Sequence, residues 1–358
     1  MKIMFYITTI ERGGGAERVI CNLANQFSNA GNQCIVVTSN DSEQKYELGK
    51  NIEYIPLTDT RISSFIRRNW KLFRLLRKVV AEHKPDVLIS FMAEPNFRTI
   101  PACAGTKTKT IISVRNDPNR EYPSLIHKFL AKTLFRKADF TVFQTKDAQT
   151  WFPKSIIRKS AIIKNQVDYR FFDEKQIEIP SNILSVGRLE PQKNHKLLID
   201  AFSKISDKCS DNLIIIGEGS LRAELENQIV NLGLSKRVLL PGTTDNVMKK
   251  LKSAKIFALS SDYEGLPNTL MEAMAIGLPC VSTDCPCGGP KELILNENNG
   301  LLTQVGNVDS MSAALARFLS DDALRKKCGD NAKRTAMAFY PDSIFALWDK
   351  TIKSVIEN

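Results

Sequence analysis

The chain has 358 residues, of which 43% are apolar and 25% charged, and its formal net charge is +11. This balance is typical of a globular protein and excludes a disordered or fibrous one. Eight scattered cysteines without a C-x-x-C pair, and three histidines, argue against a disulfide scaffold and a zinc site. The sequence contains neither a signal-peptide pattern nor an apolar run of about 18–20 residues, so we expect a cytoplasmic protein, either soluble or peripheral on a membrane.

The predicted elements alternate between short apolar strands and helices along the whole chain, which indicates parallel sheets covered by helices. The strand candidates are Ile3–Thr8, Cys34–Thr38, Val87–Phe91, Thr110–Val114, Phe140–Gln144, Ser160–Ile163, Ile183–Val186, Leu213–Ile216, Val238–Leu240, Ile256–Leu259 and Cys280–Thr283. The helical stretches include Ala16–Ala30, Lys193–Lys204, Leu221–Leu232 and Pro267–Ile276, with further helices from Leu324 onward.

Eleven strands are too many for one ordinary sheet, so the pattern predicts two doubly wound α/β domains. We expect an N-terminal domain at 1–170 and a C-terminal domain at 171–340, joined within the charged stretch 168–180. A last helix at about 340–358 is expected to pack back on the first domain. Because ligands bind beyond the carboxyl ends of parallel strands, two such domains facing each other would form a cleft.

The positive charge lies in the first half of the chain. Residues 1–180 carry 29 Lys and Arg against 18 Asp and Glu, whereas residues 181–358 carry 21 of each. The densest stretch is 61–84, with eight basic residues and one acid. Its helical spacing puts four cations on one face, Arg67, Lys71, Arg74 and Lys78, and an apolar set opposite them, Phe65, Ile66, Phe73, Leu76 and Val80.

Three interpretations of this basic helix stay open. It is a core-packed helix with a solvated basic side, an interfacial helix held by anionic lipid and substrate phosphates, or a nucleic-acid contact. The last depends on charge alone, because the sequence holds no helix-turn-helix, zinc-finger or RNA-binding sheet motif.

Glycine-rich loops follow the first strand of each half. Gly13, Gly14 and Gly15 precede a helix start, which favours an anionic ligand, although the pattern is not a dinucleotide-binding fingerprint and also fits a plain tight turn. In the second half, Arg188 and Lys193 lie in the loop V-G-R-L-E-P-Q-K-N, where two fixed cations could meet a diphosphate.

Two more loops carry candidate binding groups. The segment D-Y-E-G-L-P-N-T-L-M-E leads into a helix whose first amides are free donors, and Glu264 and Glu272 flank that helix start. The alternative is a capped helix with an incidental pair of acids. The acid at 272 argues against this alternative, because the residues around it in the helix are apolar. The loop I-G-E-G-S, with Gly217 and Gly219, suits a flat base or ribose lying against the backbone.

Together these segments resemble the retaining glycosyltransferases of family four, which have the GT-B fold. The resemblance covers nearly the whole chain and is carried by G-G-A-E-R (14–18), V-G-R-L-x-x-Q-K-N (186–194), G-x-G (217–219) and E-G-L-P-N-x-x-x-E (264–272). The loop S-T-D-C-P-C-G-G-P-K-E (282–292) resembles one found in members that build bacterial polysaccharides.

The resemblance implies roles for the matching residues. Arg188 and Lys193 would hold the donor diphosphate, Glu272 the ribose hydroxyls, and Glu264 the transferred sugar. The remaining donor contacts would come from Gly14, Gly15, Gly217, Gly219, Gly265, Leu266, Asn268 and Thr269. The family needs no divalent metal, which agrees with the lack of a D-x-D triplet, and no other cofactor is expected.

The sequence departs from the family pattern in the first domain. Many members carry a histidine after the strand that matches Thr110–Val114, whereas this loop contains Arg115, Asn116 and Asp117. Arg115 or Asn116 could contact the donor sugar, and Asp117 could either orient the acceptor or cap the turn before Pro118.

From these motifs we expect a retaining, metal-independent hexosyltransferase of surface polysaccharide, lipopolysaccharide or O-antigen assembly. It would move a hexose or N-acetylhexosamine, with N-acetylgalactosamine or galactose favoured, from a UDP-sugar to a polyprenyl-diphosphate-linked saccharide at an anionic cytoplasmic membrane surface. The alternatives are a GT-B sugar-nucleotide epimerase, which the shortage of histidine disfavours, and a basic nucleic-acid-binding protein.

Overall fold

The computed structural model describes residues 1–11, 14–41, 43, 45–57, 64–173 and 181–357, with the side chain of residue 65 left out. The chain divides into two compact units. Unit 1 comprises Met1–Asn165 and Asp342–Asn358, and unit 2 comprises Gln166–Pro341. The division falls before the expected join at 168–180, of which residues 174–180 lie outside the described part of the chain.

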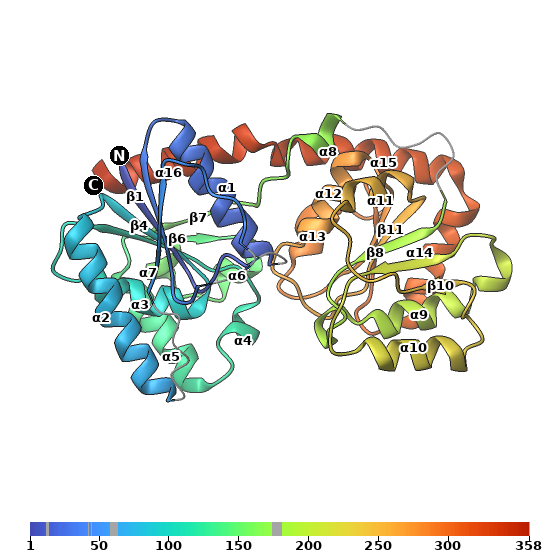
Figure 1. Ribbon diagram of the computed structural model, residues 1–358. Coiled ribbons are helices and arrows are strands. Elements are labelled where there is room, and N and C mark those ends of the chain that lie inside the picture. Colours follow the sequence, from blue (N-terminus) through green and yellow to red (C-terminus); the bar gives the residue numbers. More distant parts are fainter. Residues whose placement is uncertain (12–13, 42, 44, 58–63, 174–180, 358) are drawn as a thin grey trace. The chain divides into compact units, whose positions relative to one another are not determined.

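Unit 1 is built on a parallel sheet with the strand order β3-β2-β1-β4-β5-β6-β7 (Figure 1). The strands are β1 (Lys2–Ile7), β2 (Gln33–Thr38), β3 (Ile52–Pro56), β4 (Val87–Phe91), β5 (Lys109–Ser113), β6 (Phe140–Phe143) and β7 (Ser160–Ile162). The α-helices are α1 (Gly15–Asn29), α2 (Phe65–His83), α3 (Ala93–Cys103), α4 (Pro118–Glu121), α5 (Leu125–Leu134), α6 (Lys146–Thr150), α7 (Lys154–Ile157) and α16 (Pro341–Glu357), and a 3-10 turn, η1, spans Phe135–Lys137.

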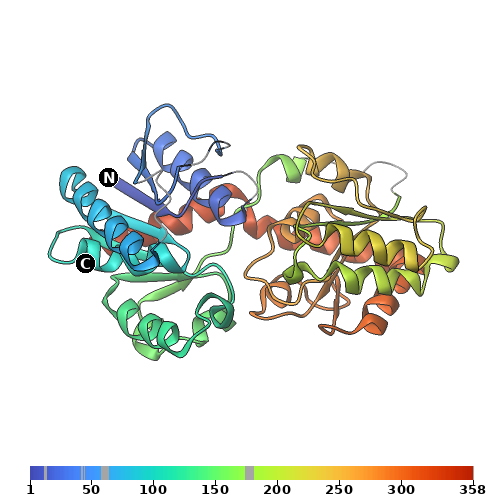
Figure 2. The same ribbon diagram turned by 60° about the horizontal axis from the view of Figure 1, so that its bottom comes forward.

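Helices cover both faces of this sheet (Figures 1 and 2). On one face, α1 and α16 pack their apolar stripes over β1 and β4, with Phe27 and Trp348 in the same cluster as Phe5. On the other face, Leu76 and Val80 of α2 pack with Tyr6 of β1. Burial on both faces explains why the strands read as continuous apolar runs.

Unit 2 repeats the plan with the strand order β10-β9-β8-β11-β12-β13. Its strands are β8 (Ile183–Val186), β9 (Leu213–Ile216), β10 (Val238–Leu239), β11 (Ile256–Leu259), β12 (Cys280–Thr283) and β13 (Leu301–Thr303). Its α-helices are α8 (Arg170–Asp173), α9 (His195–Ser203), α10 (Arg222–Asn231), α11 (Val247–Ser253), α12 (Asn268–Ile276), α13 (Gly289–Leu293), α14 (Val308–Ser320) and α15 (Asp322–Ala336), and its 3-10 turns are η2 (Pro191–Lys193), η3 (Ser206–Lys208) and η4 (Met337–Phe339).

The expected α/β class with two doubly wound sheets is confirmed. Two strands, β3 and β13, were missing from the expected set, because β3 carries Glu53 and Pro56 and β13 is only three residues long. The expected apolar face of α2 is wrong at Ile66, which is 79% exposed, since the first buried side chain among those described in the helix is Leu72. The side chain of Phe65, also expected on this face, lies outside the described part of the chain.

Candidate functional site

The donor loops predicted in the second half of the chain, together with the 282–292 loop, lie at the carboxyl edge of the unit 2 sheet. They follow β8, β9, β11 and β12, which are neighbours in the order β9-β8-β11-β12. The carboxyl ends of adjacent parallel strands meet at one edge, so loops that are far apart in sequence are brought together there.

The centre of this edge is an ion pair between Lys193 and Glu264. The Lys193 Nζ lies 2.5 Å from Oε1 of Glu264, and the two side chains are 16% and 8% exposed. The same Oε1 accepts a hydrogen bond of 2.6 Å from Ser261 Oγ, and Oε2 lies 3.5 Å from Gln192 Nε2. These donors hold the carboxyl group in one orientation, and its two oxygens together can accept further hydrogen bonds from a bound hydroxyl.

The backbone around Glu264 is clamped to the loop after β12. Its N–H donates to the carbonyl of Pro286 at 2.7 Å, and its carbonyl accepts from the N–H of Cys287 at 2.9 Å. A Cβ added to Gly289 would lie 1.8 Å from the carbonyl oxygen of Gly265. The 282–292 loop therefore supports the Glu264 loop, and only glycine at 289 permits this approach.

The Cys285 thiol beside this clamp is buried, and burial followed by the charge of Glu264 raises its pKa to about 12. Cys285 and Cys287 are both free thiols. At neutral pH the Cys285 group is a protonated thiol, which is a poor metal ligand and a poor nucleophile.

The G-x-G loop after β9 packs against the loop that carries Arg188. A Cβ at Gly217 would lie 1.9 Å from the carbonyl oxygen of Gly187, and one at Gly219 would lie 2.4 Å from that of Leu189. Gly217 also has a φ of +155°. These two glycines are thus required by contact between two loops of the protein itself, a reason that the sequence pattern did not disclose.

Arg188 and Lys193 belong to one loop but differ in environment. Arg188 is exposed, whereas the stem of Lys193 lies over Gly187, where an added Cβ would be 3.3 Å from it. His195, which begins α9 behind them, is 2% exposed. Burial and then the charge of Lys193 lower the pKa of His195 to about 4, so this ring is neutral at pH 7.

Helix α12 begins four residues after Glu264, and its N-cap residue, Pro267, has no side-chain group that could cap the helix. Asn268 and Thr269 form its first turn, and the Thr269 hydroxyl lies 3.5 Å from the carbonyl of Val186. Glu272 lies one turn further along and is 3% exposed, and Leu266 belongs to the core beneath. A helix start of this kind carries partial positive charge and favours an anionic group.

In unit 1, Gly14 and Gly15 form the start of α1. Gly14 is the N-cap residue, its carbonyl accepts from the Tyr46 hydroxyl at 3.2 Å, and Gly15 is the first helical residue. A Cβ at Gly14 would lie 1.9 Å from Oε2 of Glu17. The neighbouring Arg12 and Gly13 lie outside the described residues.

Arg115 is turned into unit 1. It is 7% exposed, its guanidinium carbon lies 3.7 Å from the ring centroid of Phe91, and its Nη1 donates to Asn165 Oδ1 at 2.7 Å. Burial lowers the pKa of Arg115 to about 9, and the charge of the nearby Glu121 partly opposes this lowering. Burial raises the pKa of Glu121 to about 8.

The neighbours of Arg115 form a helix cap. The Asp117 Oδ1 accepts from the N–H of Asn119 at 3.0 Å and caps α4, and the Asn116 Oδ1 accepts from the N–H of Asp117 at 2.8 Å. The structure therefore supplies the capping role for Asp117 that the sequence left open.

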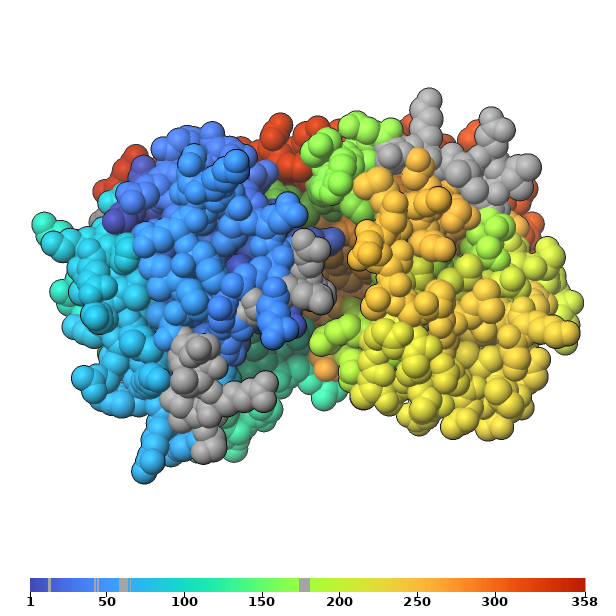
Figure 3. All heavy atoms as spheres, in the orientation of Figure 1, coloured from blue at the N-terminus to red at the C-terminus, as the bar shows by residue number. Residues whose placement is uncertain are grey.

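The four cations Arg67, Lys71, Arg74 and Lys78 are all exposed on α2. The atoms of this stretch of the chain are light blue in Figure 3. Two further cations of α2 bind elsewhere in unit 1. Arg77 donates to the carbonyls at the end of α3, and Arg68 lies 3.4 Å from the side chain of Asn40. The basic face therefore consists of the outward-pointing set, as the helical spacing predicts.

Sequence reasoning missed two sets of residues here. Ser261 and Gln192 both contact Glu264. The hint for Ser261 was the polar run after β11, and Gln192 stands in the V-G-R-L-x-x-Q-K-N motif but was given no role. Helix α5 was not singled out either, although four of its apolar side chains are exposed: Leu125 (84%), Ile126 (71%), Phe129 (66%) and Leu130 (43%).

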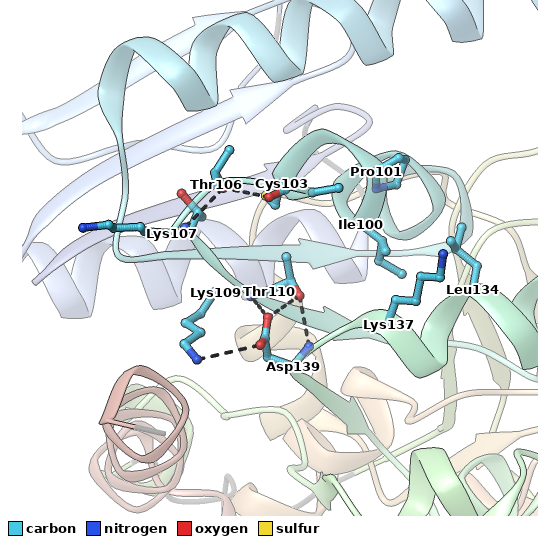
Figure 4. A pocket seen from close by; sticks show the side chains of 12 residues that line it. Ile100, Pro101, Cys103, Thr106, Lys107, Lys109, Thr110, Leu134, Lys137 and Asp139 are labelled. Carbon is cyan, nitrogen blue, oxygen red and sulfur yellow. Dashed lines mark hydrogen bonds and ion pairs between the residues drawn. The ribbon is translucent and has the colours of Figure 1, made fainter.

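A cavity of about 510 Å³ lies at the amino edge of the unit 1 sheet, where β5 and β6 begin (Figure 4). Figure 4 shows Asp139 held by Thr110, whose N–H and hydroxyl both donate to it at 2.8 Å, with Lys109 beside it. The lining residues are Ile100, Pro101, Cys103, Ala104, Thr106, Lys107, Thr108, Lys109, Thr110, Leu134, Lys137 and Asp139. None of the predicted site residues lines it.

Within the described residues, no group of three or more His, Cys, Asp or Glu is placed to hold a metal ion. In the same part of the chain, no helix combines the length and apolar character needed to cross a bilayer.

Comparison with known families matches both halves of the chain. Residues 13–170 match the family described as Glycosyltransferase Family 4, and residues 170–335 match Glycosyl transferases group 1.

Two curated relatives come from Campylobacter jejuni. The N-acetylgalactosamine-N,N'-diacetylbacillosaminyl-diphospho-undecaprenol 4-alpha-N-acetylgalactosaminyltransferase is 35% identical over 268 residues, 71% of this chain and 72% of its own. A second alpha-1,4-N-acetyl-D-galactosaminyltransferase, named for a GalNAc-GalNAc-diNAcBac-PP-undecaprenol acceptor, is 29% identical over 99% of both chains. The lipopolysaccharide 1,6-galactosyltransferase of Salmonella typhimurium is 27% identical over the full length of both chains.

Two solved structures share the fold. Sucrose-phosphate synthase from Thermosynechococcus elongatus superposes with a TM-score of 0.87 at 16% identity, over 99% of both chains. Anabaena Alr3699/HepE in complex with UDP-glucose superposes with a TM-score of 0.84 at 20% identity, over 99% of this chain and all of that one.

Proposed function

Because the chain belongs to glycosyltransferase family four and has the GT-B fold, we propose that it extends a saccharide carried on polyprenyl diphosphate, using a UDP-sugar as donor. The sugar that we propose is N-acetylgalactosamine, with galactose second. The names of the Campylobacter and Salmonella relatives support this order. The pathway would be assembly of lipopolysaccharide, O-antigen or a related glycan.

The observation that carries the proposal is the held carboxylate at the carboxyl edge of unit 2. Glu264 is 6% exposed and pinned by Lys193 and Ser261. A rigid carboxylate next to an ammonium and the start of a helix can bind sugar hydroxyls and a diphosphate at the same edge. We assign the sugar to Glu264 and the ribose to Glu272.

The proposed chemistry follows from where charge develops. Breaking the sugar–phosphate bond leaves positive character on the sugar and negative charge on the departing diphosphate. Arg188, Lys193 and the first amides of α12 would stabilise that negative charge without a metal. Retention would result if the acceptor hydroxyl attacks from the face that the diphosphate leaves, with a phosphate oxygen taking the proton.

We assign acceptor binding to unit 1, which carries the excess of positive charge. The exposed cations of α2 suit the anionic headgroups of a cytoplasmic leaflet and the diphosphate of a lipid-linked acceptor. In this proposal the enzyme is cytoplasmic and peripheral, and it uses no nucleic-acid partner.

The test is a transfer assay with purified protein, a panel of UDP-sugars and a synthetic polyprenyl-diphosphate saccharide. We expect transfer from UDP-N-acetylgalactosamine in the presence of a chelator, with an α-anomeric product by NMR. A β-linked product would contradict retention, and loss of transfer with the chelator would contradict metal independence. Conversion of the UDP-sugar into its epimer without acceptor would favour the epimerase instead.

Variants of unit 2 test the assigned residues. Changing Arg188 and Lys193 together to Ala should lower kcat by about 100-fold or more, the size seen for lost donors to a developing anion. Glu272→Ala should weaken UDP binding measured by calorimetry. Unchanged UDP affinity in that variant would mean that the ribose assignment is wrong.

A further inference from the structure

Helix α5 presents apolar side chains to the solvent, where an ordinary surface helix presents polar ones. Leu125, Ile126, Phe129 and Leu130 are between 43% and 84% exposed, and Ala131 is the buried residue of the helix. At 3.6 residues per turn the four side chains fall within about 140° around the helix axis. We call these four residues the α5 stripe.

The stripe is not accounted for by packing within unit 1. An apolar stripe on a globular protein normally faces the core, and contiguous exposed apolar surface marks an interaction site. Here α5 contacts α3 and η1 on its inner side, where Ala131 is buried, while the four side chains of the stripe are exposed.

The charge around the stripe selects the kind of partner. From Pro118 to Lys137 the chain has five basic residues and one acid, Glu121, whose carboxylate oxygens are buried. Helix α2 contacts α3, which in turn contacts α5, so α2 and α5 lie on the same side of the unit 1 sheet (Figure 1). On α2, Trp70 is 62% exposed among the cations.

Both helices also begin at the same edge of that sheet. Helix α2 follows β3, and α5 follows the loop after β5, so each N-terminus lies at the carboxyl edge. Apolar side chains flanked by cations and an aromatic ring are the pattern of a helix that lies in an anionic membrane interface.

We propose that the α5 stripe inserts into the acyl boundary of an anionic phospholipid bilayer while the cations of α2 bind its headgroups. This inference rests on the membrane docking under the proposed function and adds the apolar half of the contact. It assigns to α5 the part of the binding that salt does not screen, because insertion depends on buried apolar area and headgroup attraction depends on charge.

The experiment is co-sedimentation of the full chain with vesicles of phosphatidylglycerol and phosphatidylethanolamine at low and high salt. We expect a double variant, Leu125→Ser with Phe129→Ser, to bind vesicles about tenfold or more weakly than the unmodified chain at low salt. At high salt, it should lose most of the binding that the unmodified chain keeps. Changing the four α2 cations to Gln should instead remove the salt-sensitive part. The matched control is Val230→Ser with Leu232→Ser in unit 2, where the side chains are 64% and 41% exposed.

A second measurement reads insertion directly. In Phe129→Trp, brominated acyl chains should quench the introduced indole. Unchanged vesicle affinity in the double Ser variant, or no quenching in Phe129→Trp, would overturn the inference. A change from dimer to monomer in the double Ser variant without vesicles would overturn it in favour of an interface between copies.

Transfer to a short-chain, water-soluble acceptor separates this inference from the proposed function. The double Ser variant should retain that activity. If the unmodified chain transfers no sugar but binds vesicles through the stripe, the proposed function fails and the docking surface stands. If it transfers sugar but the double Ser change leaves vesicle affinity unaltered, the docking surface fails alone.

Discussion

At the scale of single residues, Glu264 shows how the fold prepares a carboxylate for binding. Lys193 and Ser261 both reach Oε1, and the backbone of the residue is clamped to Pro286 and Cys287. Little side-chain freedom is left to lose when a ligand arrives, so more of the interaction energy is available for binding. The sequence predicts the acid at 264, whereas its contact with Lys193 joins two segments that only the fold brings near.

Glu264→Gln should lower kcat for sugar transfer by about 100-fold, since the amide cannot accept from Lys193 and the sugar as a carboxylate does. Far-UV circular dichroism should be unchanged. The control is Glu297→Gln, which alters an exposed acid paired with Arg317. Equal kcat for Glu264→Gln and the unmodified enzyme would exclude contact between Glu264 and the reacting sugar.

Glu121 predicts a pH dependence of stability. Its pKa of about 8 in the folded protein lies above the ordinary value of 4.5, because burial disfavours the charged form. The folded state therefore binds this proton more tightly than the unfolded state, and the free energy of unfolding should fall as pH rises from about 4.5 to 8. Arg115, whose charge opposes the shift, makes the fall smaller.

Urea unfolding at pH 5, 6.5 and 8 measures this fall. Glu121→Gln lacks the titrating group, so its free energy of unfolding should fall less over the same range. An identical pH slope in the variant and the unmodified protein would show that Glu121 ionises normally.

At the scale of elements, glycine contacts decide how the loops of unit 2 stack. Gly217, Gly219 and Gly289 each bring one loop against the carbonyl of another. From the sequence, Gly217 and Gly219 were interpreted as a surface for a base, because a glycine in a strand-to-helix loop does not reveal whether a ligand or the protein's own backbone approaches it.

Gly289→Ala should shift the Glu264 loop, since the added Cβ would lie 1.8 Å from the Gly265 carbonyl oxygen. We expect a loss of about 1–3 kcal/mol in stability, as for overpacked sites, together with lower kcat. Gly49→Ala is the control, because its Cβ has no atom nearer than 3.5 Å. A melting temperature for Gly289→Ala equal to that of Gly49→Ala would mean that the Glu264 loop and the 282–292 loop can move apart without loss of stability.

Strand and helix positions were largely predictable, because alternation of apolar runs and helical spacing is a local signal. Strand β3 escaped because its pattern is interrupted by Glu53, and α5 because an apolar stripe has the same spacing whether it points inward or outward. The direction of a stripe depends on which elements pack beside the helix, and the chain's local pattern does not contain that information.

Helix α16 binds its partners in unit 1 through Trp348, which is 1% exposed and stacks on Phe91 with ring centroids 6.0 Å apart. Trp348→Ala should cost about 3–5 kcal/mol of stability, as for other large-to-small core changes. Leu347→Ala, at a side chain 47% exposed on the same helix, should stay within about 0.5 kcal/mol. Chemical denaturation of both variants compares them, and equal losses would contradict core packing by α16.

At the scale of the whole molecule, the two units have separate cores and separate charge. The sequence halves differ by eleven formal charges, all of the excess lying in residues 1–180. The same division separates the proposed tasks, since the proposed donor groups lie on the neutral unit and the cations proposed to bind a membrane lie on the basic one. The charge imbalance is visible in the composition, whereas the exposure of the α5 stripe became visible only in the structure.

UDP should protect unit 2 selectively. At about 100 times its Kd, a ligand adds about 2.7 kcal/mol to the stability of the part that it binds. In hydrogen–deuterium exchange with and without UDP, we expect slowed exchange at 187–193 and 264–272 and unchanged exchange in α2. Protection confined to unit 1 would contradict the donor assignment.

The division of the chain also bears on how the protein is made. Unit 2 is one continuous segment, Gln166–Pro341, whereas unit 1 needs Asp342–Asn358 to complete its core. That helix follows the whole of unit 2 in the chain. Although N-terminal parts usually fold first, the core of unit 1 lacks α16 until all of unit 2 has been synthesised, so we expect unit 2 to be able to fold before unit 1 is complete.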